Sequence, residues 1–300
     1  MGEILQKKMK YFVISDIHSF YDEMMKSLNE AGYDKDNPEH FLIVCGDIFD
    51  RGTKPLEVYK FLKSIPKTNR IFVKGNHEYL LEKLVERECP LGHDYHNGTY
   101  DTLFYIAGMS YSYFNFKIFE LRVNGEDDEA ESYMDKTYEK LFKGKKIKEI
   151  LKWIDKEFVD YYELDEFIFV HSLIPTYSNG ENLYNYWEGW RDKADKNAYY
   201  QATWGNPADM VLESDFANKE KGKTLVCGHF HTSHIWEELD GIKYSVTSEN
   251  PTYYSDKHPE LIALDSCTVY TKALNVLVIN EDDMEIHDHD GKVRIVARRK

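Results

Sequence analysis

The sequence predicts an α/β fold in which two β-sheets form a sandwich flanked by helices, with a helical insertion at about residues 107–165. Three features predict this architecture. Short apolar runs alternate with helical stretches in the first part of the chain, as in βαβ units. The last part has the pattern of consecutive strands joined by turns, and between the two lies an aromatic, acidic segment with helical periodicity. We expect a single domain over residues 1–300 that contains this insertion, since 300 residues suffice for one large core.

Five apolar runs in the first part of the chain predict strands that are buried on both faces of a largely parallel sheet. Each run stops at a polar cluster. The runs are Tyr11–Ser15, Phe41–Cys45, Arg70–Lys74, Glu166–Val170 and Lys223–Cys227. Helices are expected between them at Tyr21–Ala31, Pro55–Ser64 and Glu78–Glu88. This alternation indicates parallel strands joined by helical crossovers.

The C-terminal part of the chain predicts a mostly antiparallel sheet. Its expected strands are Lys243–Thr247, Leu261–Asp265, Ala273–Ile279 and Met284–Ala297. The last of these contains Asp290–Gly291, a dipeptide typical of a tight hairpin turn. Parallel units followed by an antiparallel sheet fit a two-sheet sandwich better than one doubly wound sheet.

The segment Ala107–Asp165 is predicted to be a helical insertion or a cap over the sandwich. It contains an acidic run, Asn124–Glu131. After that run, apolar residues recur at helical spacing and share one face: Ile147, Ile150, Leu151, Ile154 and Phe158. We expect the helix from Lys145 to Phe158 to dock on the sandwich through this face, and the acidic run to lie at the surface.

The formal net charge of −15 argues against nucleic acid as a partner, because nucleic-acid phosphates repel an acidic protein without a basic patch. The basic clusters Lys143–Lys148 and Arg298–Arg299–Lys300 are interpreted as solvated surface. Four cysteines without a CxxC pair indicate a reducing compartment. No run approaches the ~20 apolar residues that cross a bilayer, and residues 1–10 have no apolar targeting core. We therefore expect a soluble cytoplasmic protein with no membrane partner.

Each of the five expected strands is followed by residue types that bind metal ions or transfer protons. The endings are Ser15-Asp16-Ile17-His18, Gly46-Asp47-Ile48-Phe49-Asp50-Arg51-Gly52, Gly75-Asn76-His77-Glu78, His171-Ser172 and Gly228-His229-Phe230-His231. Because the carboxyl ends of parallel strands meet at one edge of a sheet, these side chains should lie together. Alone, each ending could be a turn, a helix cap or a satisfied buried histidine. All five, in one order, favour a site for divalent metals such as manganese, iron or zinc.

These five motifs, in this order, resemble the calcineurin-like metallophosphoesterase superfamily. Gly-Asp-x-x-Asp-Arg-Gly from Gly46, followed by Gly-Asn-His-Glu from Gly75, is more narrowly similar to the phosphoprotein-phosphatase branch. That branch includes bacterial and phage Ser/Thr phosphatases and symmetrical diadenosine tetraphosphatases. The resemblance covers Lys10–Lys74 and Thr224–Ile279, and within the latter the tail Ile262–Val278 is similar to the closing strands of that branch.

The resemblance implies two divalent metal ions, with manganese expected first and iron or zinc as alternatives. The ligands of one ion would be Asp16, His18 and His231. The ligands of the other would be Asn76, His171 and His229. Asp47 would bridge the two ions at the ~3.5–4 Å separation of two-metal sites. A metal-bridging hydroxide would then attack phosphorus in line, without a phosphoenzyme.

The resemblance also implies residues that act on the substrate. His77 would protonate the leaving oxygen, and Asp50 would orient its imidazole. Arg51 would neutralise phosphate oxygens through a bidentate contact. Asn76 would face the substrate from the metal site.

Two departures from the branch leave the substrate class open. The protein phosphatases carry a second phosphate-binding arginine in a Trp-x-Arg element, where this chain has Trp204-Gly205-Asn206. Asn206 therefore stands at that position, unless Arg191 supplies the charge from a shifted loop. The last motif also contains His231, a second histidine that many protein phosphatases lack.

Three functions are compatible with these residues. The first is a Ser/Thr protein phosphatase-like phosphomonoesterase. The second is a diadenosine tetraphosphatase-like nucleotide hydrolase or a phosphodiesterase, for which the aromatic segment Tyr177–Tyr200 could stack on a nucleobase unless it packs in the core. The third is a phosphate-binding scaffold without turnover, against which intact His77, Asp50 and Arg51 argue. The tract His287–Asp290 is interpreted as a solvated hairpin rather than a metal site.

Overall fold

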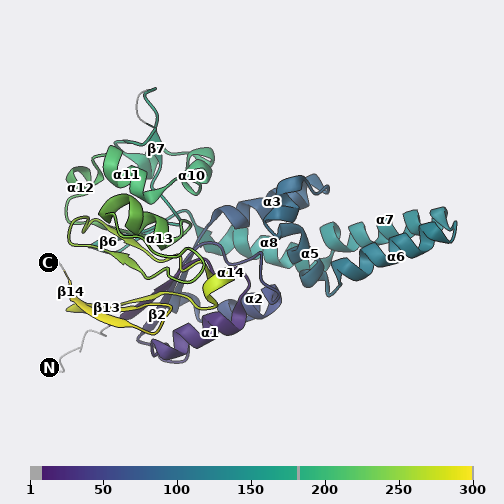
Figure 1. Cartoon of the computed structure of the whole chain (residues 1–300), viewed down its shortest axis with the longest axis horizontal. Helices are drawn as coiled ribbons and strands as arrows, with labels where there is room; N and C mark the ends of the chain where they lie inside the picture. Colours follow the sequence, from purple (N-terminus) through teal and green to yellow (C-terminus); the bar gives the residue numbers. More distant parts are fainter. Residues whose placement is uncertain (1–8, 181–182, 299–300) are drawn as a thin grey trace, which may run out of the picture.

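Two β-sheets form the centre of the protein in the computed structural model, which describes residues 9–180 and 183–298 (Figure 1). In spatial order, the first sheet contains β14 (Val293–Ala297), β13 (Asp283–His287), β12 (Val276–Ile279), β1 (Lys10–Ile14), β2 (His40–Cys45), β3 (Arg70–Val73) and β4 (Phe158–Val159). The second sheet contains β10 (Tyr253–Tyr254), β11 (Leu261–Ala263), β9 (Thr224–Cys227), β6 (Phe167–Phe169) and β5 (Tyr162–Glu163). A separate ribbon contains β7 (Thr176–Tyr177) and β8 (Asn185–Tyr186).

Both sheets combine parallel and antiparallel strands. In the first sheet β1, β2, β3 and β4 are parallel, while β12 pairs antiparallel with β1 and is followed by antiparallel β13 and β14. In the second sheet β6, β9 and β11 are parallel. The expectation that the last part of the chain forms a mostly antiparallel sheet of its own is therefore wrong. Strands β10 and β11 join the second sheet, whereas β12, β13 and β14 join the first, because each sheet has an edge with which they can pair.

The five apolar runs all form strands, as predicted: they are β1, β2, β3, β6 and β9. The hairpin at Asp290–Gly291 is also confirmed, since it connects β13 to β14 and Gly291 has a φ of +84°. The predicted strand at Lys243–Thr247 is wrong. Residues 243–245 have no regular structure and residues 246–248 form a turn. The Ser245 N–H donates to Glu249 Oε2 at 3.1 Å, and β10 occupies the edge of the second sheet instead.

Helices lie on the outer faces of both sheets, which confirms the predicted sandwich flanked by helices (Figure 1). The helices before β6 are α1 (Tyr21–Glu30), α2 (Pro55–Ser64), α3 (Asn76–Arg87), α4 (Gly92–His96), α5 (Thr99–Ala107), α6 (Tyr111–Val123), α7 (Asp127–Lys143) and α8 (Lys145–Glu157). Those after β6 are α9 (Trp190–Lys193), α10 (Lys196–Ala202), α11 (Pro207–Glu213), α12 (Phe216–Lys219), α13 (Thr232–Ile235) and α14 (Thr268–Thr271). None of the helices in residues 9–180 and 183–298 combines the length and the apolar character that a membrane-spanning helix requires.

Apolar side chains fill the space between the two sheets. Val13, Ile43 and Val73 from the first sheet belong to one buried cluster with Phe169 and Val226 from the second. These residues are the alternate positions of the predicted strands, whose other faces pack against the outer helices. The close-packed interface fixes the ends of the parallel strands relative to one another, which is what a precise site between them needs.

The helical insertion is confirmed, but its placement differs from the expected cap. Helix α8 docks on the first sheet through Ile147, Ile150 and Ile154, as predicted, and Trp153 completes the buried face by contacting the rings of residues 49, 59, 72 and 158. In contrast, α6 and α7 pack on each other and project away from the sandwich (Figure 1). The acidic residues 126–129 are exposed, as expected, at the end of this hairpin.

Candidate active site

The loops after β1, β2, β3, β6 and β9 bring buried histidines and carboxylates together around Asp47. Asp47 Oδ1 lies 3.3 Å from His171 Nε2, and Asp47 Oδ2 lies 3.7 Å from His18 Nε2. Two groups have ligand atoms within 4.8 Å of one another: His18, Asp47 and His77, and Asp47, His171 and His229. Asp47 belongs to both groups. A shared carboxylate is the arrangement that a bridging metal ligand requires.

Backbone carbonyls orient two of these imidazoles. His171 Nδ1 lies 2.8 Å from the carbonyl oxygen of Cys45, and His18 Nδ1 lies 3.1 Å from that of Phe49. In each ring an N–H on Nδ1 donates to the carbonyl, so the lone pair of Nε2 is directed towards Asp47. Metal-ligating histidines are commonly held in this way by a second hydrogen bond.

Two other predicted ligands contact this cluster directly. The Asp16 carboxylate accepts the His229 N–H, at 3.0 Å and 3.2 Å from its two oxygens. Its Oδ1 also lies 4.0 Å from His18 Nε2. Asn76 Oδ1 lies 2.8 Å from His171 Nε2. The structure therefore brings Asp16 and Asn76, which are 60 residues apart, to the same cluster.

His231 lies beside a carboxylate that the sequence analysis left without a role. The His231 side chain is half-buried, and its Nε2 lies 3.9 Å from Asp265 Oδ2. Asp265 is 4% exposed, and its other oxygen accepts the Cys267 N–H at 2.8 Å. The only sequence signal for Asp265 was its position at the end of the expected strand Leu261–Asp265, within the tail Ile262–Val278 that resembles the phosphoprotein-phosphatase branch.

Glu78 fixes the loops that carry Asp47 and Asn76. Its carboxylate accepts three backbone N–H groups: those of Gly75 at 2.9 Å, Asp47 at 3.0 Å and Ile48 at 2.8 Å. Burial and the charge of Asp47 raise the pKa of Glu78 to about 7, although these hydrogen bonds oppose the shift. Gly75 is required by close approach, because a Cβ at this position would lie 2.3 Å from Asp47 Oδ1. The motif Gly75-Asn76-His77-Glu78 contains Glu78 but does not by itself indicate this role.

Several residues of the cluster have left-handed backbone conformations. The φ angle is 51° at Asp16, 48° at His18, 54° at Asp47, 75° at Asp50 and 67° at His229. Each such residue costs on the order of 1–3 kcal/mol unless its surroundings hold it, and these conformations concentrate at functional sites. The strained turns direct the side chains inwards from the strand ends.

The electrostatics of the cluster favour metal binding. Burial and nearby carboxylates raise the pKa of Asp16 well above its usual range. Burial, together with neighbouring cationic or imidazole groups, lowers the pKa of His18 and brings that of His229 to about 3. Burial alone would raise the pKa of Asp47, but the surrounding histidines outweigh it and lower this pKa. Neutral imidazoles and buried carboxylates are the protonation states that a divalent cation needs, and the cation would offset the cost of the buried negative charge.

Asp50 and Thr99 hold His77 in place. His77 Nδ1 lies 2.7 Å from Asp50 Oδ2, and the Thr99 hydroxyl donates to the same oxygen at 2.6 Å. Burial would lower the pKa of His77, but the carboxylates of Asp47 and Asp50 outweigh it, and the pKa is raised. Arg51 is exposed, and its Nη2 lies 3.4 Å from His77 Nε2. The imidazole is thus disposed to carry a proton beside a guanidinium that faces solvent.

Arg191 lies in an ion-pair network instead of at the cluster. Its Nε donates to Glu163 Oε1 at 2.5 Å, and its two terminal nitrogens donate to the carboxylate of Glu220 at 2.8 Å and 3.0 Å. The guanidinium carbon also lies 4.3 Å from the centroid of the Trp190 ring. Because carboxylates occupy both edges of the guanidinium, the structure does not place Arg191 as a second phosphate contact.

Asn206 has a local role in the structure. Its Oδ1 accepts the Ala208 N–H at 3.0 Å as the N-cap of α11, and its Nδ2 donates to Glu238 Oε2 at 2.9 Å. The residue of this loop that reaches the cluster is Trp204, whose ring centroid lies 6.0 Å from that of His229. The Trp204 side chain is 42% exposed, so it offers an aromatic surface next to the cluster.

A family comparison connects this geometry with known proteins. The model of the calcineurin-like phosphoesterase family matches residues 9–233, which include all five strand endings. The chain belongs to this family. The resemblance inferred from the five motifs is therefore confirmed. The closing strands β11 and β12 lie beyond the matched residues.

Two curated relatives that match part of this chain are named bis(5'-nucleosyl)-tetraphosphatases. The chain is 43% identical over 76 residues to an asymmetrical bis(5'-nucleosyl)-tetraphosphatase of Bacillus velezensis, a match that covers 23% of this chain and 30% of the relative. It is 36% identical over 70 residues to a symmetrical bis(5'-nucleosyl)-tetraphosphatase of Vibrio vulnificus, covering 23% of this chain and 25% of the relative. The chain thus matches less than a third of the length of these two relatives.

Solved phosphatase structures share the fold of this phosphoesterase. A cold-active protein tyrosine phosphatase superposes with a TM-score of 0.56 at 18% identity, over 96% of this chain and 78% of that chain. A protein serine/threonine phosphatase of Saccharomyces cerevisiae superposes with a TM-score of 0.50 at 12% identity, over 98% of this chain and 82% of that chain. At these identities the likeness concerns the fold.

The donor set of the cluster fits the divalent metals of metallophosphoesterases. It combines carboxylate oxygens from Asp16 and Asp47, an amide oxygen from Asn76 and imidazole nitrogens from His18 and His171. Such mixed ligands suit manganese, iron or zinc better than calcium, which takes oxygen ligands. The candidate metal groups and the family thus agree on metal binding at the carboxyl edge of the strands.

Two other segments that the sequence singled out are mainly structural. In the aromatic segment Tyr177–Tyr200, Trp190 and Tyr199 are buried in the core of the second sheet, whereas Tyr177 is exposed. In the tract His287–Asp290 the hairpin is confirmed, but it is not wholly solvated. Asp288 is buried and accepts the N–H of residue 252 at 2.8 Å, which ties the hairpin to the chain before β10.

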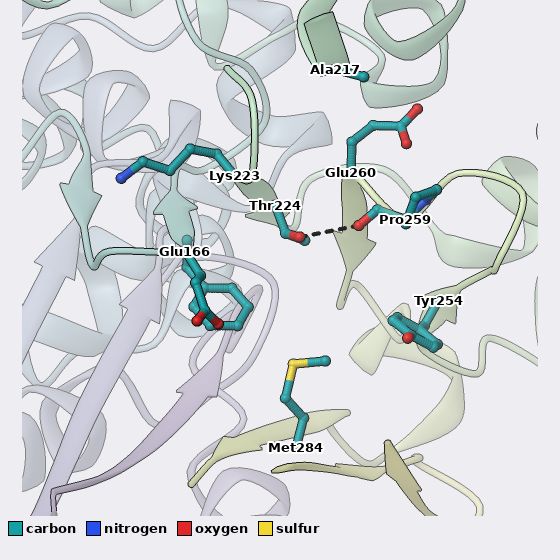
Figure 2. A pocket seen from close by; sticks show the side chains of 10 residues that line it. Glu166, Ala217, Lys223, Thr224, Tyr254, Pro259, Glu260 and Met284 are labelled. Atoms are coloured by element: carbon teal, nitrogen blue, oxygen red, sulfur yellow. Dashed lines mark hydrogen bonds between the residues drawn. The ribbon is translucent and has the colours of Figure 1, made fainter. Parts of the chain in front are cut away.

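A cavity of about 260 Å³ lies beside the first residues of β6 and β9 (Figure 2). Thr224, the first residue of β9, lines this cavity, whereas the candidate metal ligands His229 and His231 follow the last residue of β9. Its polar side chains already have partners: Thr224 donates to the Pro259 carbonyl, Lys223 to Glu163, and Glu166 pairs with residue 298. The cavity is therefore separate from the candidate active site.

Proposed function

We propose that this protein is a two-metal phosphoesterase that hydrolyses a phosphate ester or anhydride by in-line attack of water. The observation that carries the proposal is Asp47, whose carboxylate belongs to two candidate metal groups at once. Asp16, His18 and His231 are proposed for one ion and Asn76, His171 and His229 for the other. Manganese is the first candidate, with iron or zinc as alternatives. One phosphoesterase domain over residues 1–300 is proposed to carry the site.

The protein's own residues would position the substrate and move the proton. When bound, the two metal ions supply an activated water nucleophile and neutralise charge on the phosphoryl group. His77, with its Nδ1 held by Asp50, would donate the Nε2 proton to the leaving oxygen. Arg51 is exposed beside that nitrogen and would hold two phosphate oxygens as charge develops. A binding scaffold without turnover would not need this proton donor, so its geometry favours an enzyme.

The phosphomonoester of a phosphorylated protein is the first candidate substrate, following the resemblance to protein phosphatases. A nucleotide anhydride, such as a dinucleoside tetraphosphate, is the second, and two observations favour it. Carboxylates hold Arg191 away from a substrate. Among the described residues, Arg51 is then the arginine that lies beside the cluster. The exposed Trp204 beside His229 also offers a surface on which a nucleobase can stack.

Turnover by the manganese-loaded protein on three substrates would test the proposal: a phosphopeptide, diadenosine tetraphosphate and a nitrophenyl phosphodiester. Hydrolysis in ¹⁸O-labelled water should place the label in the product phosphate without a covalent intermediate. Trp204→Ala should lower kcat/KM for the dinucleotide more than for the phosphopeptide if the second candidate is correct. Tyr177→Ala, at a 50% exposed aromatic residue on β7, is the matched control. Metal binding without turnover on any phosphate ester would contradict the enzyme and leave the scaffold.

We also propose a compartment for the protein and a class of partner that it does not bind. Cys45, Cys89, Cys227 and Cys267 are free thiols, and three of them are buried. Unpaired buried thiols are typical of proteins in a reducing compartment, so we propose the cytoplasm. The net charge of −15 continues to argue against nucleic acid as a partner.

A further inference from the structure

The α6–α7 hairpin projects from the sandwich and exposes an aromatic face. Helix α6 packs on α7 through Phe114 and Leu121, which are buried. The opposite face of α6 carries exposed side chains: Phe116 is 59% exposed, Phe119 is 65% exposed and Val123 is 68% exposed. In Figure 1 this hairpin extends well beyond the other helices, so a partner can approach it without meeting the rest of the chain.

The spacing on this face is that of a helix–helix seam. Ser112, Phe116, Phe119 and Val123 follow one another at intervals of four, three and four residues, which is the heptad spacing of positions that pack against another helix. Tyr113, which is 60% exposed, flanks the seam. Large apolar groups at these positions are what a helical interface uses, and solvated helices rarely expose several aromatic rings on one side.

Charge is distributed unevenly along the hairpin. Its tip is acidic, with exposed carboxylates at residues 126–129, whereas its base carries the exposed Lys140, Lys143, Lys145 and Lys146. Three of these lysines pair with two carboxylates: Lys143 lies 2.9 Å from Glu88, and Lys145 and Lys146 lie 4.0 Å and 2.8 Å from Glu149. Even so, one end of the hairpin is negative and the other is positive. The acidic run that the sequence singled out lies at the start of α7, and the lysine cluster lies at the end of α7 and the start of α8.

We propose that the seam of α6 binds the same seam of a second copy of this chain, with the two helices antiparallel about a two-fold axis. In this arrangement Phe116 faces Phe119 of the other copy, and Ser112 faces Val123. Each acidic tip lies near the lysines at the base of the other hairpin, so the charges are complementary, whereas a parallel pair would place the two acidic tips together. The two hairpins form a four-helix arrangement, a common form of symmetric dimer.

The surface available is sufficient for a weak but specific dimer. From their exposed fractions, Tyr113, Phe116, Phe119 and Val123 together offer roughly 450 Å² of accessible surface per copy. With the flanking polar residues, a symmetric pair buries on the order of 1,000 Å² or slightly more, at the lower end of specific interfaces. We therefore expect dissociation in the micromolar range. The proposal concerns a surface outside the active site and does not depend on the proposed function.

Sedimentation of the full chain across the micromolar range tests the proposal. Wild type should pass from monomer to dimer as its concentration rises. Phe116→Glu/Phe119→Glu should raise the dissociation constant by roughly 30-fold or more, as expected for central aromatic residues of an interface. Ile295→Glu is the matched control, because Ile295 on the edge strand β14 is 73% exposed and also apolar. It should leave the dissociation constant unchanged.

Cysteine cross-linking in a Cys89→Ser background tests the antiparallel orientation. The double variant Ser112→Cys/Val123→Cys should form disulfide-linked dimers under oxidation, whereas each single variant should not. Cross-linking by the single variants would show a parallel pair and overturn the proposed geometry. Neutralising residues 126–129 should weaken the dimer several-fold at low salt and less at high salt.

Three outcomes would overturn the dimer itself. The wild type could remain monomeric through the highest concentration, or it could stay dimeric when Phe116 and Phe119 are glutamate. Loss of the dimer in Ile295→Glu would place the interface at the sheet edge instead. Because the substituted side chains are exposed, the melting temperature and circular dichroism of the dilute variants should match those of wild type.

Discussion

His77→Asn is the substitution that separates the two roles that the geometry allows this residue. The imidazole is 2% exposed, its Nδ1 is held by Asp50 at 2.7 Å, and its Nε2 lies 3.8 Å from Asp47 Oδ2. As a general acid, His77 would protonate the leaving oxygen. As a metal ligand, it would complete the group of His18 and Asp47. Asparagine removes the imidazole proton donor. Its side chain is also too short to reach the place of Nε2, whether Nε2 protonates the leaving oxygen or binds a metal ion.

We expect the variant to retain wild-type metal content and to lose activity in proportion to the need for proton transfer. General acid catalysis contributes roughly 10²–10⁴-fold, so an alkyl phosphate with a poor leaving group should lose about that much in kcat. A nitrophenyl phosphate, whose leaving group is already stable as an anion, should lose much less. Asp50→Asn should cause a smaller loss in the same direction, because it removes the partner that orients His77 and raises its pKa.

Steady-state kinetics on the two leaving groups and elemental analysis of the dialysed, metal-loaded protein provide the readouts. Activity on the poor leaving group should fall as the pH rises through the pKa of His77, since the acid must be protonated. A metal content below that of wild type would show that His77 is a ligand. Equal losses on the good and the poor leaving group would also refute the acid role.

Four further predictions test other parts of the structure. Asp47→Asn should reduce metal content at both sites together in elemental analysis, and an unchanged content would contradict the bridge. Arg191→Ala should lower the Tm by about 3–6 °C with kcat/KM nearly unchanged, because its contacts are internal. Burial and Glu238 raise the pKa of Asp209 to about 6. This raised pKa favours the folded state below pH 4 and loses that effect as pH rises through 6, so Asp209→Asn should raise the Tm at pH 8 and have little effect at pH 4. Neutralising residues 126–129 should lower the Tm by less than about 5 °C, since these carboxylates are exposed.

The strands and most of the site residues could be predicted because their signals are local. Each apolar run is followed within six residues by its functional side chains, as in Ser15–His18 after β1 and Gly228–His231 after β9. Parallel strands then bring those endings to one edge whatever lies between them. The buried face of α8 was predictable for the same reason, because helical periodicity reports one face of one element. Lys243–Thr247 shows the limit, since a short β-prone segment becomes a strand only if a sheet edge is free to pair with it.

The sequence by itself determined the α/β sandwich and the metal-binding chemistry, because both follow from the order of residues within single elements. Only the tertiary structure decided which side chains are available for that chemistry. Arg191 looked free in the sequence, but the fold places it between Glu163 and Glu220. Thr99 and Asp265 gave no clear signal, yet the fold places them beside Asp50 and His231. Residues distant in the chain meet only through packing, so their hydrogen bonds and charges are set by the fold and not by their spacing.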